Sequence, residues 1–400
     1  MKKIYLIIAA IALSAMAGPT LKAQRQNTNL TVVPPAAKVV SPVIDGNKTT
    51  FSIAAPQAIN VSLHGSWMNP DDNCYGTLVQ DTKVGVIPMT RGEGGVWSCT
   101  IDTPAAELWT YNFYIDGVYV PDFANPLIQR DGTRLLSILL VPGKLSENYS
   151  GATKHGNLNQ VWYNSPTLGM ERRMYVYTPY GYEDKANAKK KYPVLYLLHG
   201  AGCDEDTWES MGRVTAIVDN LIEKGKAVPM IVVMPNGNGS QSCSPFLQIP
   251  APEEAVAAAR QNRNGFVDSI VKDIVPYIES HYRVIAKPEY RAVSGLSMGG
   301  GHTLSVTSKY PGTFAYICPM GCGGHRTEEF VNGLLGIKKA GYKLYWHAAG
   351  SADFAYSGAK VLDEILTENG MEHTFYQKNG GHTWSNWRIF LNEMLPLLFK

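Results

Sequence analysis

In residues 160–400, short apolar runs rich in β-branched and aromatic residues alternate with stretches of helical periodicity. This alternation is typical of a mostly parallel sheet that is covered by helices on both faces, so we expect an α/β fold here. The expected strands lie in MYVYTP, PVLYLLHG, MIVVMPNG, YRAVSG, FAYICPMG and KLYWHAAG. The expected helices cover residues 214–224, 265–281, 298–309, 358–369 and 385–399.

Several of these runs end in Gly or Pro followed by polar residues, at the sheet edge where α/β proteins place their chemistry. One leads into Gly295-Leu296-Ser297-Met298-Gly299, a G-x-S-x-G pattern. In a nucleophile elbow, this pattern forms a strained strand-to-helix turn that exposes the serine hydroxyl. A Cβ at either flanking glycine would collide with the turn or the packed helix. The alternative is a glycine-rich loop that merely contains a serine.

A serine nucleophile needs an adjacent base, which a third group orients. In α/β-hydrolases the order along the chain is Ser, then Asp or Glu, then His. His382 fits as the base, because NGGHTW is a glycine-rich loop between the β-prone HTFYQ and the last helix. His347 lies inside an apolar strand and is expected to be a hydrogen-bonded core residue. Three others share the helix of Ser297 or lack a comparable loop: His302, His325 and His373.

The acid is expected on the loop after the run YKLYWHAAG, which indicates Asp353 in GSADF. The alternative role for Asp353 is to cap the helix that follows, which aspartate does well. Asp363 and Glu364 fall inside a helical run and are expected to be solvated.

An oxyanion hole needs two backbone N–H groups aimed at the developing negative charge. One is expected from Met298, directly after the nucleophile. The second is expected from the loop in LYLLHGAGCDEDTW, where we assign Ala201, with Gly202 as the alternative.

The first part of the chain has a different pattern of short alternating strands, from Ile44 to Val141. The sequence WTYNFYIDGVYV predicts a hairpin at Asp116-Gly117. About 100 residues of this kind predict an all-β sandwich. An earlier strand is expected to turn alternate residues to one face: Ile59, Val61, Leu63, Gly65 and Trp67.

The N-terminal sequence MKKIYLIIAAIALSAMAGPTLKAQ is typical of a secretory signal peptide, so we expect a periplasmic or secreted protein. Cleavage is expected after Ala23, with Ala17 as the alternative. A retained anchor is the rival interpretation, and no membrane insertion is expected after cleavage. The expected organisation is a signal peptide at 1–23, an extended lead-in at 24–43, the sandwich at 44–142, a linker at 143–157 and the hydrolase at 158–400.

Charge and cysteine content exclude some classes of partner. Residues 24–400 carry 33 basic and 34 acidic residues, so no electrostatic case exists for nucleic acid or an anionic membrane.

Disulfides are permitted in an oxidising compartment, and Cys74 could pair with Cys99. Cys318 and Cys322 lack a companion Cys or His cluster at zinc-finger spacing, so no metal site is expected. No cofactor is expected either.

The segments YPVLYLLHGAGCDEDTW, PMIVVMPNG, VSGLSMGG and GGHTWSNWRIFLNEMLPLLF resemble the family-one carbohydrate esterases, within the esterase D-like branch of the α/β-hydrolases. That family includes feruloyl esterases and acetylxylan esterases. The resemblance implies an α/β-hydrolase fold and hydrolysis of carboxylic esters. It also implies a nucleophile at Ser297, an acid at Asp353, a base at His382 and backbone donors at Ala201 and Met298.

The earlier segments VSLHGSWM, GVWSCTIDT and YNFYIDGVYVPDFANP resemble the immunoglobulin-like carbohydrate-binding modules of family forty-eight. The pairing is similar to secreted bacterial enzymes that act on plant xylan, so an esterified plant polysaccharide or oligosaccharide is the expected partner. Residues 238–264 do not align with the esterase family and are expected to shape the acyl pocket.

Aromatic residues supply candidates for substrate contacts. Tyr114 points away from the expected core face of its strand and is a candidate for sugar binding. Trp208 and Trp384 are candidates for lining the cleft, although helix packing explains them equally well. The competing functions are a siderophore esterase of the enterochelin type, and a non-catalytic glycan-binding protein with a degenerate hydrolase domain.

Overall fold

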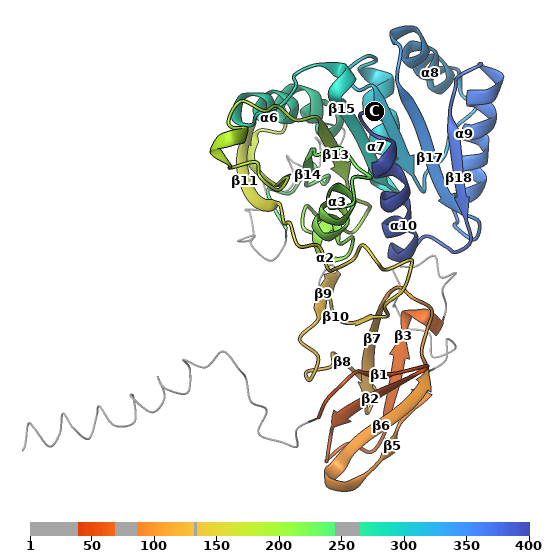
Figure 1. Cartoon of the computed structure of the whole chain (residues 1–400). Coiled ribbons are helices and arrows are strands. Elements are labelled where there is room, and N and C mark those ends of the chain that lie inside the picture. Colours follow the sequence, from red (N-terminus) through yellow and green to blue (C-terminus); the bar gives the residue numbers. More distant parts are fainter. Residues whose placement is uncertain (1–38, 69–85, 132–133, 245–264) are drawn as a thin grey trace, which may run out of the picture.

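The computed structural model describes residues 39–68, 86–131, 134–244 and 265–400. Figure 1 shows two parts, with an all-β domain below a larger domain built on one wide sheet. Among the described residues, no helix combines the length and the apolar character that crossing a membrane requires.

Two antiparallel sheets form the all-β domain, a four-stranded one in the order β1-β2-β6-β5 and a six-stranded one in the order β4-β3-β7-β10-β9, with β8 paired to β7. Its strands are β1 (Val43–Asp45), β2 (Lys48–Ala54), β3 (Val61–Gly65), β4 (Ile87–Pro88), β5 (Thr90–Arg91), β6 (Val96–Asp102), β7 (Leu108–Ile115), β8 (Val118–Val120), β9 (Ile128–Asp131) and β10 (Arg134–Leu140). Phe51 and Trp97 of one sheet pack with Leu63 and Phe113 of the other in one core. The two sheets therefore form a sandwich.

The predicted hairpin at Asp116-Gly117 is confirmed. Strands β7 and β8 pair across it, and both turn residues have positive φ, 49° and 85°. This conformation is what a tight hairpin turn requires, and glycine adopts it without steric cost. The expected place of Ile59 on the same strand face as Val61 and Leu63 is wrong, because Ile59 lies before β3 begins at Val61 and is 80% exposed.

One eight-stranded sheet organises the larger domain, in the order β11-β12-β14-β13-β15-β16-β17-β18. The six strands from β14 to β18 run parallel, whereas β11 and β12 are antiparallel to their neighbours. The strands are β11 (Asn157–Ser165), β12 (Met170–Thr178), β13 (Val194–Leu198), β14 (Ile231–Pro235), β15 (Arg291–Leu296), β16 (Tyr316–Met320), β17 (Leu344–Gly350) and β18 (Thr374–Lys378). The predicted mostly parallel sheet is confirmed.

Helices cover both faces of this sheet, as its buried strands require (Figure 1). The described helices are α2 (Thr207–Ser210), α3 (Val214–Glu223), α5 (Gly265–Ser269), the π-helical η5 (Ile270–Ile274), α6 (Val275–His281), α7 (Met298–Lys309), α8 (Glu328–Ala340), α9 (Tyr356–Glu368) and α10 (Trp384–Met394). Short 3-10 turns are η1 (Ser66–Met68), η2 (Glu93–Gly95), η3 (Lys185–Asn187), η6 (Pro288–Tyr290) and η7 (Leu395–Leu397).

Strand β13 shows how the layers form. Leu195 and Leu197 pack into the core under α3 and α10, while Val194, Tyr196 and Leu198 pack into the core under α5 and α6. Both faces of the strand are buried, which explains its continuous apolar sequence.

Helix α8 was not among the predicted helices, although its sequence carries end signals. The Thr327 hydroxyl accepts a hydrogen bond from the Phe330 amide at 3.3 Å, and Gly341 follows the helix with φ of 84°. Glu328 and Glu329 lie in the first turn, where the helix dipole favours negative charge. A Thr cap and a terminal Gly could therefore have located this helix.

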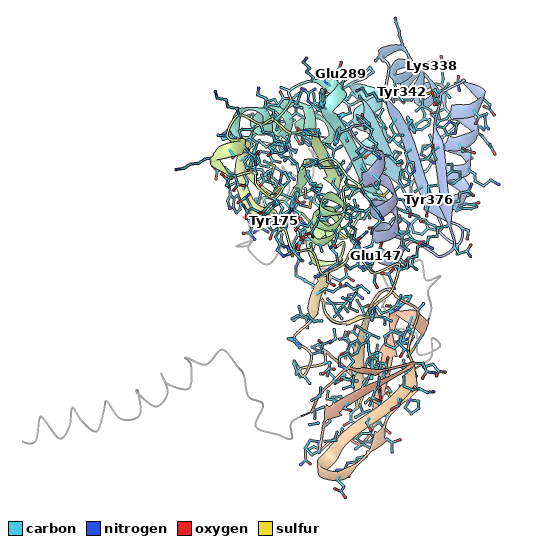
Figure 2. All side chains as sticks on the ribbon, in the orientation of Figure 1. Glu147, Tyr175, Glu289, Lys338, Tyr342 and Tyr376 are labelled. Atoms are coloured by element: carbon cyan, nitrogen blue, oxygen red, sulfur yellow. The ribbon has the colours of Figure 1, made fainter. Side chains whose placement is uncertain are left out.

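The two domains share packed surface. Leu108 and Ile138 of the sandwich belong to the same apolar core as α3 and α10. Glu107 forms a buried ion pair with Arg388 of α10 at 3.0 Å. Glu147, labelled at this junction in Figure 2, lies 3.7 Å from Lys224. Apolar burial and buried charge therefore both hold the domains together.

The described cysteines are free thiols: Cys99, Cys203, Cys243, Cys318 and Cys322. Cys74, the suggested partner of Cys99, lies outside the described residues.

Candidate active site

Ser297 lies at the turn between β15 and α7, with φ of 52° and ψ of −114°. This positive φ is strained for a residue with a side chain and matches an elbow turn. A Cβ on Gly295 would come within 2.5 Å of the Gly299 backbone, and one on Gly299 within 2.6 Å of the Leu198 carbonyl oxygen. The predicted need for both glycines is confirmed.

His382 and Asp353 face each other between the loops that follow β18 and β17. The Nδ1 atom of His382 is 2.9 Å from each carboxylate oxygen of Asp353. The two side chains are 5% and 0% exposed, so water screens this pair little. The carboxylate therefore orients the imidazole with Nδ1 as the protonated nitrogen and Nε2 on the opposite side of the ring.

Asp353 does not cap α9, whose N-cap residue is Ala355, but it fixes the turn that leads into that helix. Its Oδ1 accepts a hydrogen bond at 2.7 Å from the amide of Ala355, at the start of α9. One carboxylate thus fixes both the local turn and the histidine ring.

The end of β16 connects the serine to this pair. The amide of Ser297 donates to the carbonyl of Met320 at 2.9 Å. A Cβ on the next residue, Gly321, would be 3.3 Å from Asp353 Oδ2 and 2.2 Å from the Trp387 ring. The ring of Trp387 packs edge-on against His382 at 4.8 Å. The structure thus brings the elbow to the same sheet edge as the histidine and the aspartate.

The expected oxyanion loop passes beside the elbow. A Cβ on Gly200 would be only 3.4 Å from the Cβ of Ser297. Ala201 follows on the exposed surface, and Met298 is half-buried at the start of α7. The two expected backbone donors therefore belong to segments that flank Ser297.

His199 is a residue whose positioning role the sequence did not predict. Its Nδ1 lies 2.8 Å from the Gly200 carbonyl oxygen, and its Nε2 accepts from the Gly237 amide at 2.7 Å. Burial lowers the pKa of His199, so the ring is held neutral. A neutral imidazole with one donor and one acceptor nitrogen matches both contacts.

The buried carboxylate of Glu205 anchors the loop that follows Ala201. Glu205 accepts from Arg173 at 2.7 Å, from Asn236 at 2.9 Å and from the amide of Ser244 at 2.8 Å. Desolvation raises the pKa of Glu205, while the Ser244 amide and Arg173 oppose that shift. These contacts leave few alternative positions for the segment that follows Ala201.

Arg130 of the sandwich domain reaches the same loop. Its Nη2 lies 2.7 Å and 2.8 Å from the two carboxylate oxygens of Asp204, and 3.1 Å from Asp206. The side chains of Arg130 and Asp204 are 11% and 4% exposed. The first domain therefore helps to fix the loop that contains Ala201.

The predicted substrate roles of the two tryptophans do not fit their burial. Trp208 is 1% exposed, and its indole N–H donates to the Leu198 carbonyl at 3.0 Å. Trp384 is 9% exposed and packs edge-on against Trp208 at 5.4 Å. Both rings are used for packing between helices, the alternative that the sequence left open.

A small pocket at the domain junction touches Trp384. It has a volume of about 40 Å³, and Ser66, Trp109, Thr383 and Arg388 are among its lining residues. This volume has room for very few waters and not for a sugar or an aromatic acid.

Tyr114 lies in β7 of the sandwich, half-buried, with its ring edge-on to Tyr119 at 5.5 Å. It therefore stays a candidate within the first domain. Most of the segment expected to shape the acyl pocket, residues 245–264, lies outside the described residues.

Phe354 is an aromatic residue beside the pair that the sequence analysis did not select. It is 64% exposed, and its ring centroid lies 4.3 Å from that of His382. A large apolar side chain directly after Asp353 in a polar loop was the available signal.

Comparisons with known proteins indicate the class of enzyme. Residues 165–322 match the family model described as a putative esterase. The chain is 28% identical over 318 residues to an endo-1,4-beta-xylanase/feruloyl esterase of Xylanibacter ruminicola, a match that covers 78% of this chain. The chain spans 41% of the length of that relative.

Two solved structures show the same fold. One is a ferulic acid esterase from Anaeromyces mucronatus, with a TM-score of 0.50, 24% identity, and 62% of this chain and 93% of that chain covered. The other is an enterobactin esterase from Shigella flexneri, with a TM-score of 0.60, 15% identity, and 89% and 94% covered. Together, the family match and the relative named as a feruloyl esterase support a carboxylic ester hydrolase.

Proposed function

We propose that this protein is a secreted serine carboxylesterase that removes feruloyl or acetyl esters from plant xylan or its oligosaccharides. The observation that carries the proposal is the buried His382–Asp353 pair, 2.9 Å apart, at the same sheet edge as the Ser297 elbow. The relative from Xylanibacter ruminicola is named as an endo-1,4-beta-xylanase/feruloyl esterase, and this name supports xylan esters as the class of substrate.

Hydrolysis proceeds in two steps that share one set of residues. The Ser297 hydroxyl oxygen attacks the acyl carbonyl carbon while His382 Nε2 takes the hydroxyl proton. Asp353 holds the Nδ1–H and stabilises the imidazolium that forms. The amides of Ala201 and Met298 stabilise the oxyanion. His382 then gives the proton to the sugar oxygen as the bond between that oxygen and the acyl carbon breaks. The sugar alcohol departs, and the acyl group stays bound to Ser297.

Water completes the reaction by the same route. His382 removes a proton from water, the resulting hydroxide attacks the acyl-serine carbonyl, and Ser297 leaves with the proton that His382 returns. The products are a carboxylic acid and the de-esterified sugar, with no cofactor required.

The position of Phe354 favours a substrate with an aromatic acyl group over one with an acetyl group. Its exposed ring lies beside His382, where it could pack against a phenyl ring that reaches the carbonyl at Ser297. An acetyl group is too small to use that surface.

The first domain is proposed to be an immunoglobulin-like module of the carbohydrate-binding type, with Tyr114 as the candidate sugar contact. Its contacts to the oxyanion loop through Arg130 suggest that it also supports the hydrolase directly. A periplasmic or extracellular location is part of the same proposal, because the substrate is a plant polysaccharide.

A siderophore esterase is the second candidate. The likeness to the enterobactin esterase extends over 89% of the chain, and so over both domains. Against it, a catecholate–iron substrate is strongly anionic, whereas residues 24–400 carry nearly equal numbers of acidic and basic residues.

The test is release of ferulate and acetate from arabinoxylan by the purified protein, with hydrolysis of enterobactin measured in parallel. Ser297→Ala is expected to lower turnover by several orders of magnitude, as loss of a triad member does. Ser305→Ala is the matched control, because Ser305 is exposed on the same helix. Faster hydrolysis of enterobactin than of the xylan esters would favour the second candidate, and near-normal activity of Ser297→Ala would overturn both.

A further inference from the structure

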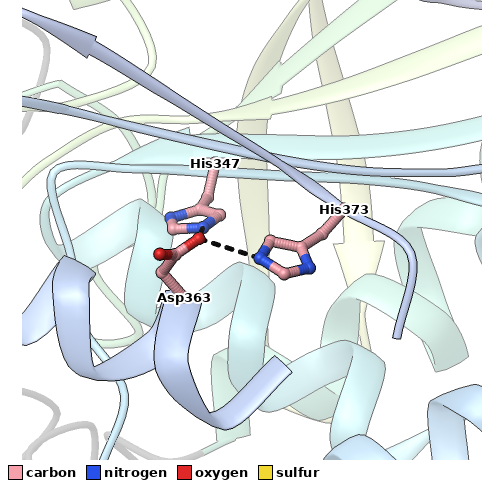
Figure 3. A group of neighbouring side chains, drawn as sticks. All are labelled: His347, Asp363 and His373. Atoms are coloured by element: carbon pink, nitrogen blue, oxygen red, sulfur yellow. Dashed lines mark hydrogen bonds and ion pairs between the residues drawn. The ribbon is translucent and has the colours of Figure 1, made fainter. Parts of the chain in front are cut away.

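Three side chains of types that often bind metal ions meet on the face of the sheet that α9 covers. His347 comes from β17, Asp363 from α9, and His373 from the residue before β18 (Figure 3). One potential ligand atom from each lies within 4.8 Å of the others. Asp363 Oδ1 is 2.8 Å from His373 Nε2 and 3.9 Å from His347 Nε2.

His347 makes this cluster unusual. The side chain is 1% exposed, and neither ring nitrogen has a hydrogen-bond partner among the residues that the structure describes. The predicted core position of His347 is confirmed, but the predicted hydrogen bond is not found among the described residues. Its ring is stacked on Phe375, with centroids 4.4 Å apart and planes inclined by 9°, so packing fixes its orientation. A buried polar group without a partner is costly, so an ion that bound His347 would relieve that cost.

His373 is oriented as metal-bound histidines commonly are. Its Nδ1 lies 2.8 Å from the carbonyl oxygen of Met371, which can only accept a hydrogen bond. The N–H is therefore on Nδ1, and the Nε2 atom points at Asp363. This contact from a backbone carbonyl fixes the ring and makes Nε2 the electron-pair donor.

Either a proton or a metal ion can explain why Nε2 of His373 lies so close to the Asp363 carboxylate. A second proton on His373 would give an imidazolium–carboxylate pair, but would leave His347 without a partner. A divalent cation would satisfy the carboxylate and both histidines together. A single ion can bind only one nitrogen of His347, so it is the orphaned Nε2, which faces Asp363, that favours the cation.

The donor set and spacing fit a transition metal. Two ligand atoms on a tetrahedral Zn²⁺ with bonds near 2.0–2.1 Å are about 3.3 Å apart. The observed 2.8 Å and 3.9 Å bracket that separation. Asp363 is 40% exposed, so its side chain can shift by a few tenths of an ångström and water can take a fourth position. Two imidazoles and one carboxylate suit Zn²⁺, whereas Mg²⁺ and Ca²⁺ prefer oxygen ligands alone.

We propose that His347, Asp363 and His373 bind one divalent transition-metal ion of the Zn²⁺ type, as a structural site separate from the reacting serine. The ion would link β17, α9 and β18. Strand β17 leads directly to Asp353, and β18 leads to the loop that carries His382. A bound ion would thus brace the elements that present both the acid and the base of the hydrolase.

The test is metal binding by the full chain after treatment with a chelator and dialysis. Titration calorimetry with Zn²⁺ is expected to show one ion per chain with a dissociation constant at or below about 1 μM, and Mg²⁺ to show no uptake. Co²⁺ provides an independent readout, because a tetrahedral N/O site gives visible absorption bands. Activity is not the readout, since added metal can also bind His382.

Three variants decide the assignment. His347→Phe replaces an orphaned polar ring by an apolar one of similar shape, so folding is expected to be retained, and Asp363→Asn changes a partly exposed residue. Each is expected to weaken Zn²⁺ binding more than about 100-fold, beyond what loss of an outer contact costs. His325→Gln alters an exposed histidine and is expected to bind like the wild type.

Failure to take up Zn²⁺ would overturn the proposal, and the His373–Asp363 contact would then be an imidazolium–carboxylate pair. Uptake that His347→Phe and Asp363→Asn leave unchanged would overturn it equally, because the ion would then bind elsewhere. Neither result depends on the ester that the enzyme hydrolyses.

Discussion

The Arg130 guanidinium, in the sandwich domain, binds both carboxylate oxygens of Asp204, which lies three residues after Ala201 in the hydrolase domain. Both partners are largely buried, and they are 74 residues apart in sequence. The contact joins a strand of the first domain to the loop proposed to stabilise the oxyanion. It makes the first domain part of the support of the active site.

Arg130→Met is therefore expected to lower kcat by about tenfold or more, with a smaller change in KM. The substitution leaves Asp204 buried without its cation, and the loop must rearrange to solvate it. Steady-state kinetics on an aryl ester measure the effect. Arg134→Met is the control, because Arg134 pairs with Asp131 inside the sandwich. Equal losses of kcat in both variants would mean that general destabilisation, and not the loop, is responsible.

Asp353→Asn separates the two roles of Asp353. Asparagine keeps an oxygen that can accept from the Ala355 amide, but it loses the charge that steadies His382. We expect a fall in kcat of about 10⁴-fold with a melting temperature close to that of the wild type. If Asp353 only fixed the turn before α9, turnover would be nearly unchanged.

Phe354→Ala is expected to raise KM for methyl ferulate by about two- to tenfold, the value of one aromatic contact. Hydrolysis of an aryl acetate should change less, and Phe354→Tyr should retain most of the ferulate activity. Phe123→Ala is the control, since Phe123 is similarly exposed, at 77%, but lies in the sandwich domain. An unchanged ratio of ferulate to acetate activity would remove Phe354 from the acyl site.

Arg388→Met is expected to destabilise the protein by about 3–5 kcal/mol, because Glu107 would be left buried without its partner. Desolvation already raises the pKa of Glu107, and the charge of Arg388 opposes that shift. Lys48→Met removes an exposed, solvent-screened ion pair with Asp102 and should leave the free energy of unfolding nearly unchanged. Denaturant unfolding compares the two, and similar small losses would show that the buried pair contributes little.

Because His302 is largely buried, we expect the free energy of unfolding to fall at acid pH. Burial, and secondarily the neighbouring His199, lower its pKa in the folded protein to about 4. An unfolded histidine titrates near about 6.5, so between these values the unfolded chain binds more protons. The contribution of His302 is thus complete above about pH 6.5 and falls as the pH drops toward 4, by up to about 3 kcal/mol.

The measurement is the free energy of unfolding from pH 7 to pH 4 for the wild type and His302→Gln. The variant should lose less stability over that range, because glutamine does not titrate. His325→Gln, at an exposed position, should follow the wild-type curve. Parallel curves for the wild type and His302→Gln would contradict the assigned cause.

Features that depend on neighbouring residues could be predicted from the sequence. Alternating apolar runs and helical stretches predicted the parallel sheet, and the pattern around Ser297 predicted the elbow and the need for Gly295 and Gly299. The order of Ser297, Asp353 and His382 along the chain, together with their loops, selected the histidine and aspartate that the structure places 2.9 Å apart.

Which distant side chains meet, and which are buried, could not be predicted from the sequence, because both depend on the packing of the whole chain. Trp208 and Ile59 have the same apolar character in sequence, yet one is 1% exposed and the other 80%. The pairing of Arg130 with Asp204, and the convergence of His347 with Asp363 and His373, join separate elements. Periodicity and turn chemistry act over a few residues, whereas these contacts depend on how strands, helices and domains pack across the whole chain.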